Sequence, residues 1–279
     1  MSGLVPLDWL EGRLGDPGVV LLEVSFYPPD KAAWFRGHIP GSRYVYWKDL
    51  CWHDSDRQFP EPGVMAQRLG RLGAGDDSTV VLIGDTIQFA TYAYWVMSMT
   101  GLEERAVVLD GGHRTWEEQG RPMTMDEPRP AQPRSLPVGV SDHSSRVGRN
   151  DVLAGLSDAG RTLVDLRSGE EYRGERVAPL TAPFDHGAER GGHIPGARHL
   201  HHERLLRQDG TFRPPDEIEA EFAAVDAGPG QQVVTYCRLS HRASLGWFAL
   251  TRLGERDDVK VYDGSWTEWG SMVGMPVEQ

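Results

Sequence analysis

An internal duplication constrains the fold of this 279-residue chain more than any other feature of its sequence. Residues 37–42 read GHIPGS, and residues 192–197 read GHIPGA. A second pair of motifs follows, Asp-Gly-Gly at 110–112 and Asp-Gly-Ser at 263–265, each with a tryptophan six residues after its aspartate. The length fits two domains of roughly 100 to 150 residues, so we expect two tandem copies of one domain.

Apolar, β-branched runs lie at corresponding places in the two copies. Residues 79–83 and 232–236 are predicted to be buried parallel strands, and a helix-like segment follows each, at 90–99 and 243–253. Alternating strands and helices indicate an α/β fold, in which each domain is a mostly parallel sheet flanked by helices. Further strands are predicted at 19–24, 106–109, 162–165 and 259–261, and a helix over 217–224, whose start at Asp216 and Glu219 resembles a capping box.

A proline-rich run divides the copies. Residues 125–142 have no hydrophobic periodicity, which is typical of an extended linker. The predicted N-terminal domain therefore covers residues 1–124, and the predicted C-terminal domain covers residues 143–279. The prolines of the linker are Pro128, Pro130, Pro133 and Pro137.

Two tryptophans align the copies with one another. Trp95 lies ten residues after Asp85, and Trp247 lies ten residues after Cys237. Asp85 therefore occupies the position of Cys237, and the N-terminal domain is expected to be catalytically inactive. The other cysteine, Cys51, has no comparable context and is interpreted as structural or incidental.

The loop that begins at Cys237 carries the strongest chemical signal. This cysteine directly follows a predicted buried strand and precedes a helix. In open α/β sheets ligands bind at this place, because free backbone N–H groups and the helix dipole favour negative charge. We therefore expect a reactive thiolate, with a buried small apolar side chain as the alternative. The loop residues are Cys237, Arg238, Leu239, Ser240, His241 and Arg242, of which the two arginines add positive charge.

The duplicated GHIPGA/S and Asp-Gly-Gly/Ser motifs and the Cys-x-x-x-x-Arg loop resemble the tandem rhodanese sulfurtransferases over nearly the whole chain. The resemblance implies two α/β domains, of which only the C-terminal one is catalytic. It also implies that Cys237 takes a sulfane sulfur from a donor as a persulfide and passes it to cyanide or a thiol. The loop N–H groups from Arg238 to Arg242 would hold the persulfide, and the two arginines would orient the donor. No metal or organic cofactor is implied.

The loop departs from both donor types of this family. Thiosulfate-type enzymes typically have Cys-Arg-Lys-Gly-Val-Thr, and 3-mercaptopyruvate-type enzymes have Cys-Gly-Ser-Gly-Val-Thr. Arg238 matches the first pattern, while Leu239 lacks the lysine charge, so thiosulfate is favoured and 3-mercaptopyruvate stays open. The family often has a substrate-binding arginine where this chain has Glu171. Arg173 or Arg167 could supply that contact, with a solvated helix charge as the alternative.

Three further features of the C-terminal copy have more than one interpretation. His241 could donate a hydrogen bond to the donor or could be structural. The insertion at 175–191 could shape the mouth of the pocket. A cluster of three histidines and one glutamate suggests a metal site. However, His199 and His201 alternate as strand neighbours do, and no acidic or cysteine partner is fixed by spacing, so no metal site is predicted. The residues of the cluster are His199, His201, His202 and Glu203.

Two other functions remain open for this architecture. Cys-based phosphatases and arsenate reductases need one more residue between the cysteine and the arginine, whereas Arg242 follows Cys237 by five positions. That shorter loop favours sulfur chemistry over phosphate chemistry. A sulfur-relay protein would instead deliver the persulfide sulfur to a partner protein or biosynthetic enzyme, and fold alone does not separate this role from an enzyme's.

Charge and hydropathy limit the compartment and the partners. The net charge of −12 argues against nucleic acid, because phosphate binding needs a basic surface. The sequence shows no secretory signal and no apolar run of about 18 residues, so neither secretion nor a membrane span is predicted. We expect a cytoplasmic protein with a small anionic sulfur donor, a thiol or cyanide acceptor, and a protein acceptor as a further candidate.

Overall fold

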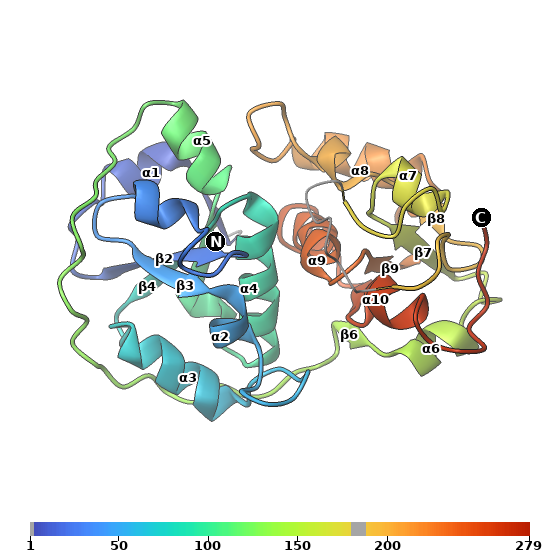
Figure 1. Ribbon diagram of the computed structural model, residues 1–279, viewed down its shortest axis with the longest axis horizontal. Coiled ribbons are helices and arrows are strands. Elements are labelled where there is room, and N and C mark those ends of the chain that lie inside the picture. Colours follow the sequence, from blue (N-terminus) through green and yellow to red (C-terminus); the bar gives the residue numbers. More distant parts are fainter. Residues whose placement is uncertain (1–2, 180–187) are drawn as a thin grey trace. The chain divides into compact units, whose positions relative to one another are not determined.

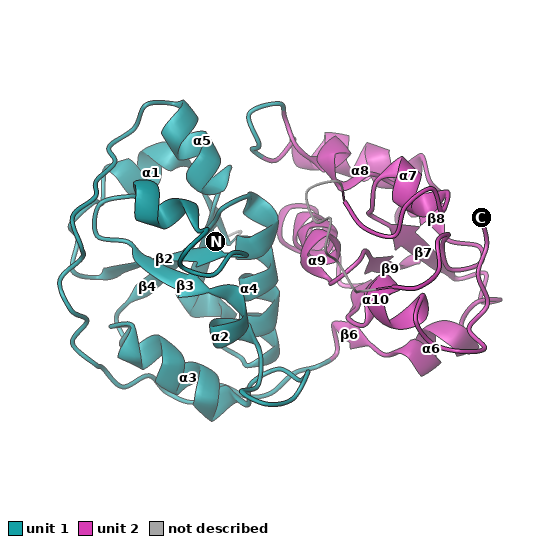
Figure 2. Ribbon diagram, viewed as in Figure 1, with its two compact units in different colours: residues 1–143, 208–211 teal, residues 144–207, 212–279 magenta. Residues whose placement is uncertain are grey.

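The computed structural model describes residues 3–179 and 188–279, which group into two units (Figure 2). The described residues up to His143, together with Gln208–Thr211, form unit 1, and Ser144–Arg207 with Phe212–Gln279 form unit 2. The proline-rich stretch 125–142 belongs to unit 1 and contains no helix or strand. Within the described residues, no helix is long and apolar enough to cross a membrane.

Unit 1 contains a five-stranded, entirely parallel sheet with the order β1-β5-β4-β2-β3. Helices cover both faces of this sheet (Figure 1), with α1 and α5 on one side and α3 and α4 on the other. The strands are β1 (Leu4–Val5), β2 (Val19–Ser25), β3 (Arg43–Tyr46), β4 (Thr79–Gly84) and β5 (Ala106–Leu109). The helices are α1 (Leu7–Glu11), η1 (Ala33–Arg36), α2 (Trp47–Cys51), α3 (Pro62–Arg71), α4 (Ile87–Met99), η2 (Glu103–Arg105) and α5 (Gly112–Glu118).

Unit 2 repeats this topology, with the parallel order β6-β10-β9-β7-β8. Each of its strands holds the place of one strand of unit 1, which confirms the tandem α/β architecture. The strands are β6 (Arg146–Val147), β7 (Arg161–Asp165), β8 (Arg198–His199), β9 (Gln232–Tyr236) and β10 (Val259–Tyr262). The helices are α6 (Arg149–Ala154), α7 (Gly169–Tyr172), η3 (His202–Leu205), α8 (Pro215–Ala223), α9 (His241–Phe248), η4 (Ala249–Leu253) and α10 (Ser265–Trp269).

The strands are continuous apolar runs because both faces of each sheet are covered. In unit 2 one face packs against α6 and α10, whose side chains Val152, Trp266 and Trp269 are fully buried. On the opposite face Gly246 of α9 packs closely against Leu166 and Thr235.

The predicted strands are confirmed, but two helix predictions need correction. Helix α8 starts at Pro215 after the cap residue Pro214, without a side-chain cap bond, so Asp216 lies inside the first turn and the capping box is wrong. The predicted segment 243–253 is α-helical only to Phe248. It then widens into a π-helical turn, in which the Gly254 N–H donates to the Ala249 carbonyl at 3.0 Å.

The topology fixes where a ligand can bind in unit 2. Strands β7 and β9 are neighbours, but the chain continues from β7 to β8 on one side and from β9 to β10 on the other. The connections therefore diverge at the carboxyl ends of these two strands, which is the usual ligand site of an open α/β sheet. Cys237 directly follows β9 at this place.

Candidate active site

The loop after β9 holds Cys237 rigidly at its base. Its N–H donates to Ser265 Oγ at 3.2 Å, and its carbonyl accepts from the N–H of Trp266 at 2.9 Å. The residue is 1% exposed. Ser265 opens helix α10 with a φ of 51°, so the Asp-Gly-Ser motif after β10 is the second wall of the site. Sequence reasoning found this motif as a repeat and missed its role here.

A left-handed residue turns the loop into helix α9. Ser240 has a φ of 71°, and its hydroxyl donates to the main-chain carbonyl of Asp263. The N–H of Ser244 then donates to the Ser240 carbonyl at 2.8 Å, which closes the first turn of the helix. Within the described residues, no protein atom accepts from the backbone N–H of Leu239, Ser240 or Arg242. These N–H groups can therefore serve a bound anion.

Arg242 at the end of the loop forms a buried, bidentate ion pair with Glu171. The two terminal nitrogens of the guanidinium lie 2.7 and 2.9 Å from the two carboxylate oxygens. Glu171 also forms a capping box with Ser168 at the start of α7, because its carboxylate accepts from the Ser168 N–H at 3.1 Å. One side chain thus fixes both the helix and the loop arginine.

This ion pair perturbs both of its members. Burial acts to raise the pKa of Glu171, but the hydrogen bond and charge of Arg242 outweigh burial and hold that pKa at about 2. Burial likewise acts to lower the pKa of Arg242, but the hydrogen bonds that Arg242 donates to Glu171 and the charges of Cys237 and Glu171 outweigh burial and raise it. Glu171 therefore compensates much of the positive charge that Arg242 brings to the loop.

The other arginines considered from sequence lie in different environments. Arg173 is exposed and pairs with Glu175 at 2.6 Å, as a solvated helix charge would. Arg167 is completely buried, pairs with Asp165 at 2.6 Å and donates to the Gly192 carbonyl at 2.7 Å. Its role here is therefore to join β7 to the second GHIPGA motif.

The remaining loop residues differ in exposure. Arg238 and Leu239 are half-buried, and His241 is buried at the start of α9. The insertion at 175–191 lies partly outside the described residues, since 180–187 are not described. Its described end is held by Arg190, which donates to four carbonyls near the C-terminus.

The corresponding loop of unit 1 is closed. Asp85 Oδ2 accepts from Ser25 Oγ at 2.7 Å and from the Phe26 N–H at 3.0 Å, and burial raises the pKa of this carboxyl. Helix α4 begins two residues later, whereas α9 begins four residues after Cys237. A Cβ added at Gly112, the counterpart of Ser265, would lie 2.6 Å from the Gly84 carbonyl oxygen. Unit 1 has no room for the cradle of unit 2.

The second cysteine is inert by its surroundings. Cys51 ends α2 and is fully buried, and burial raises the pKa of its thiol, against a smaller effect of Arg68. A protonated, inaccessible thiol is a poor nucleophile.

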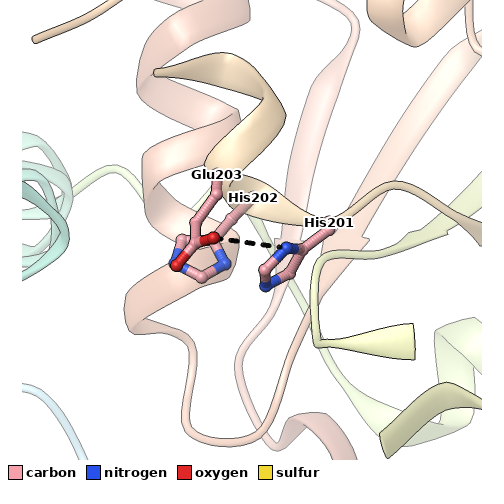
Figure 3. Close-up of side chains that lie close together, drawn as sticks. All are labelled: His201, His202 and Glu203. Atoms are coloured by element: carbon pink, nitrogen blue, oxygen red, sulfur yellow. Dashed lines mark ion pairs between the residues drawn. The ribbon is translucent and has the colours of Figure 1, made fainter. Parts of the chain in front are cut away.

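The histidines after β8 are arranged differently from the expectation of a continuing strand. The strand ends at His199, whose Nε2 lies 2.9 Å from the Arg167 carbonyl oxygen. The next residues turn into η3, which brings His201, His202 and Glu203 together (Figure 3). Burial and the charge of Arg242 lower the pKa of His202 well below its ordinary value, and burial lowers the pKa of His201. Both rings are therefore neutral near pH 7.

Removing the hydroxyl of Ser265 is expected to weaken the loop. The Ser265→Ala variant leaves the buried N–H of Cys237 without its acceptor, which costs about 1–3 kcal/mol. We expect a lower urea midpoint and slower reaction of Cys237 with a sulfur donor. The exposed Ser271→Ala change in the same region is the control. If Ser265→Ala and Ser271→Ala had the same urea midpoint and the same rate of reaction with the donor, Ser265 would not support the Cys237 loop.

Comparison with known proteins agrees with the two-unit architecture. A family model described as "Rhodanese-like domain" matches residues 6–119 and 149–272. The chain is 38% identical to the "Sulfur carrier protein TtuD" of Thermus thermophilus, over 98% of this chain and 95% of that protein. It is 36% identical to a Mycobacterium tuberculosis protein named "Putative thiosulfate sulfurtransferase", over 99% of this chain and 97% of that protein.

Solved structures show the same fold. The crystal structure of YnjE matches with a TM-score of 0.80 and 26% identity, over 99% of this chain and 68% of that chain. The wild-type structure of EanB matches with a TM-score of 0.82 and 25% identity, over 100% of this chain and 69% of that one.

Proposed function

Since the chain belongs to the rhodanese-like domain family, in two tandem copies, we propose that it is a sulfurtransferase that carries sulfur as a persulfide on Cys237, with thiosulfate as the donor. The observation that carries this proposal is the loop after β9. In this loop Cys237 directly follows β9 at the topological switch point, and backbone N–H groups of the residues after it have no acceptor within the described residues.

The first half-reaction transfers sulfur to the enzyme. The Cys237 thiolate attacks the outer sulfur of thiosulfate, a new S–S bond forms, and the old S–S bond breaks with its electron pair leaving on sulfite. The outer sulfur is then the charged end of the persulfide. The N–H groups of Leu239, Ser240 and Arg242 can stabilise that charge without reorganising, because the loop is already fixed by Ser265 and Asp263.

The second half-reaction returns the enzyme to its thiolate. Cyanide attacks the outer sulfur, takes it as thiocyanate, and leaves the electron pair of the broken bond on Cys237. A thiol acceptor reacts in the same way after losing its proton. No step needs an oxidant or a reductant, because the transferred sulfur keeps its sulfane oxidation level while it passes from one nucleophile to the next.

Three arginines near the loop differ in their surroundings. Arg242 is compensated by Glu171, and Arg173 is paired and exposed. Arg238 is half-buried and adjacent to the thiol. We expect Arg238 to orient the oxyanion end of a donor.

Parallel incubation with two donors tests this function. Thiosulfate is expected to add one sulfur atom to the intact chain, removable by cyanide, with a kcat/KM at least about tenfold above that of 3-mercaptopyruvate. The reason is that the sulfite leaving group of thiosulfate has three oxygens, which would accept hydrogen bonds from Arg238 and the loop N–H groups. Intact mass and thiocyanate formation are the measurements.

Arg238→Gln and Arg173→Gln form the matched pair for that assay. Loss of one charge-assisted hydrogen bond at Arg238 is expected to lower kcat/KM for thiosulfate about tenfold to a hundredfold. Arg173→Gln should match the wild type, because Arg173 is exposed and paired with Glu175. A preference for 3-mercaptopyruvate would refute the donor and leave the sulfurtransferase in place. No sulfur gain from either donor would refute the function itself.

A sulfur-carrier role is the second candidate, because the Thermus relative is named as a sulfur carrier protein. A carrier should hold its persulfide against small acceptors, whereas an enzyme should discharge it rapidly. Discharge of the loaded chain by cyanide and by glutathione, followed by intact mass, separates the two roles.

A further inference from the structure

The cluster after β8 has the composition of a metal site. The ligand atoms of His201, His202 and Glu203 all lie within 4.8 Å of one another, and His201 Nδ1 is 3.7 Å from Glu203 Oε2. Figure 3 shows the three side chains converging on one side of the η3 turn. Two imidazoles and one carboxylate are a common ligand set for zinc with an open fourth position.

A second observation points to a missing ligand at this place. Within the described residues, Nδ1 of His202 is buried and has no hydrogen-bond partner. A buried ring nitrogen without a partner costs free energy, and coordination to a metal ion would remove that cost.

The cluster lies at the same edge of the sheet as the thiol. The His202 N–H donates to the Leu166 carbonyl at 3.3 Å, and the Leu166 N–H donates to the Tyr236 carbonyl at 2.9 Å. Tyr236 directly precedes Cys237. The positive charge of Arg242 nearby would oppose a cation, but its bidentate pair with Glu171 compensates it.

We propose that His201, His202 and Glu203 bind one divalent transition-metal ion of the zinc class, at a site separate from Cys237. Zinc needs ligand atoms roughly 3.3 Å apart, as follows from bonds of about 2.0 Å in a tetrahedron. The Glu203 side chain is 72% exposed and can rotate to close the difference.

The test uses the full-length Cys237→Ser chain, so that the reactive thiol cannot bind the probe. Titration with Zn²⁺ alone, followed by calorimetry, is expected to give one ion per chain. Co²⁺ should give the visible absorption bands of a tetrahedral site. In the same background, Glu203→Gln should weaken Zn²⁺ binding at least about tenfold, and the double change His201→Gln and His202→Gln should abolish it.

The control is His143→Gln, which removes an exposed histidine outside the cluster and should leave Zn²⁺ affinity unchanged. Circular dichroism shows whether the double histidine variant folds. Glu203→Gln alters only an exposed side chain, so its result stands even if the double variant does not fold. Absence of Zn²⁺ uptake by the Cys237→Ser chain, or equal affinity in the Glu203→Gln chain, would overturn the proposal.

Discussion

Replacing Cys237 with serine is expected to abolish persulfide formation and to lower sulfur transfer to cyanide by at least about a thousandfold. A serine hydroxyl is not ionised near neutral pH, and oxygen does not carry sulfur as a persulfide does. The loop should keep its shape, because the bonds from residue 237 to Ser265 and Trp266 are made by the backbone. Intact mass after thiosulfate treatment and a thiocyanate assay measure the effect.

The other cysteine provides the matched control. Cys51→Ala should retain transfer, since Cys51 is buried in unit 1 and burial keeps its thiol protonated. The wild type should gain one sulfur per chain, because Asp85 stands at the corresponding position of unit 1. A cyanide-sensitive sulfur on the Cys237→Ser chain, or two on the wild type, would contradict the single-site mechanism.

The Glu171→Gln variant is expected to lose about 3 kcal/mol of unfolding free energy. A carboxyl pKa held at about 2 instead of 4.5 corresponds to about this amount. Leaving Arg242 as an uncompensated buried charge gives a loss of similar size, about 3–5 kcal/mol. Urea unfolding of the full chain, followed by circular dichroism, measures the change.

The pH dependence of this loss has a defined sign. Because the pKa of Glu171 is lowered by folding, its contribution is fully present above about pH 4.5 and disappears as the pH falls through about 2. The difference in unfolding free energy between the wild type and Glu171→Gln should therefore become smaller only between about pH 4.5 and pH 2. Glu175→Gln breaks an exposed pair with Arg173 and should have no measurable effect. If Glu171→Gln and Glu175→Gln lost the same unfolding free energy, and this loss were constant from pH 7 to pH 3, the ion pair of Glu171 with Arg242 would be excluded as its cause.

The sequence predicted the sheets and the position of the thiol because those features are local. Buried parallel strands are continuous apolar runs, and a cysteine between a strand and a helix is visible in a few residues. The pair of Glu171 with Arg242 could not be predicted, since the two residues are 71 apart in sequence and meet only when β7 and β9 are neighbours. The sequence indicates only that Glu171 stands where the family often has an arginine.

The role of Ser265 and the histidine cluster depended on backbone geometry in the same way. Ser265 reaches Cys237 because its own backbone is left-handed, with a φ of 51°. The residue types of the Asp-Gly-Ser motif do not predict that conformation. The alternation of His199 and His201 predicted a strand, but pairing with β7 stops at His199 and the chain turns. Alternation of side chains predicts a strand only where a partner strand pairs with it, and none pairs with His201 within the described residues.

The closed loop of unit 1 would make an active site hard to gain there by single substitutions. A cysteine at position 85 would meet a helix that begins two residues later, and no arginine lies between Asp85 and Ala90. A Cβ at Gly84 would collide with the Thr86 carbonyl, and Gly112 is packed against Gly84. Recovery would require a longer loop and a reshaped turn before any new nucleophile could be selected. If Cys237 is the one site that carries sulfur, a change of donor would therefore be reached through the loop of unit 2 alone, while unit 1 keeps its packing.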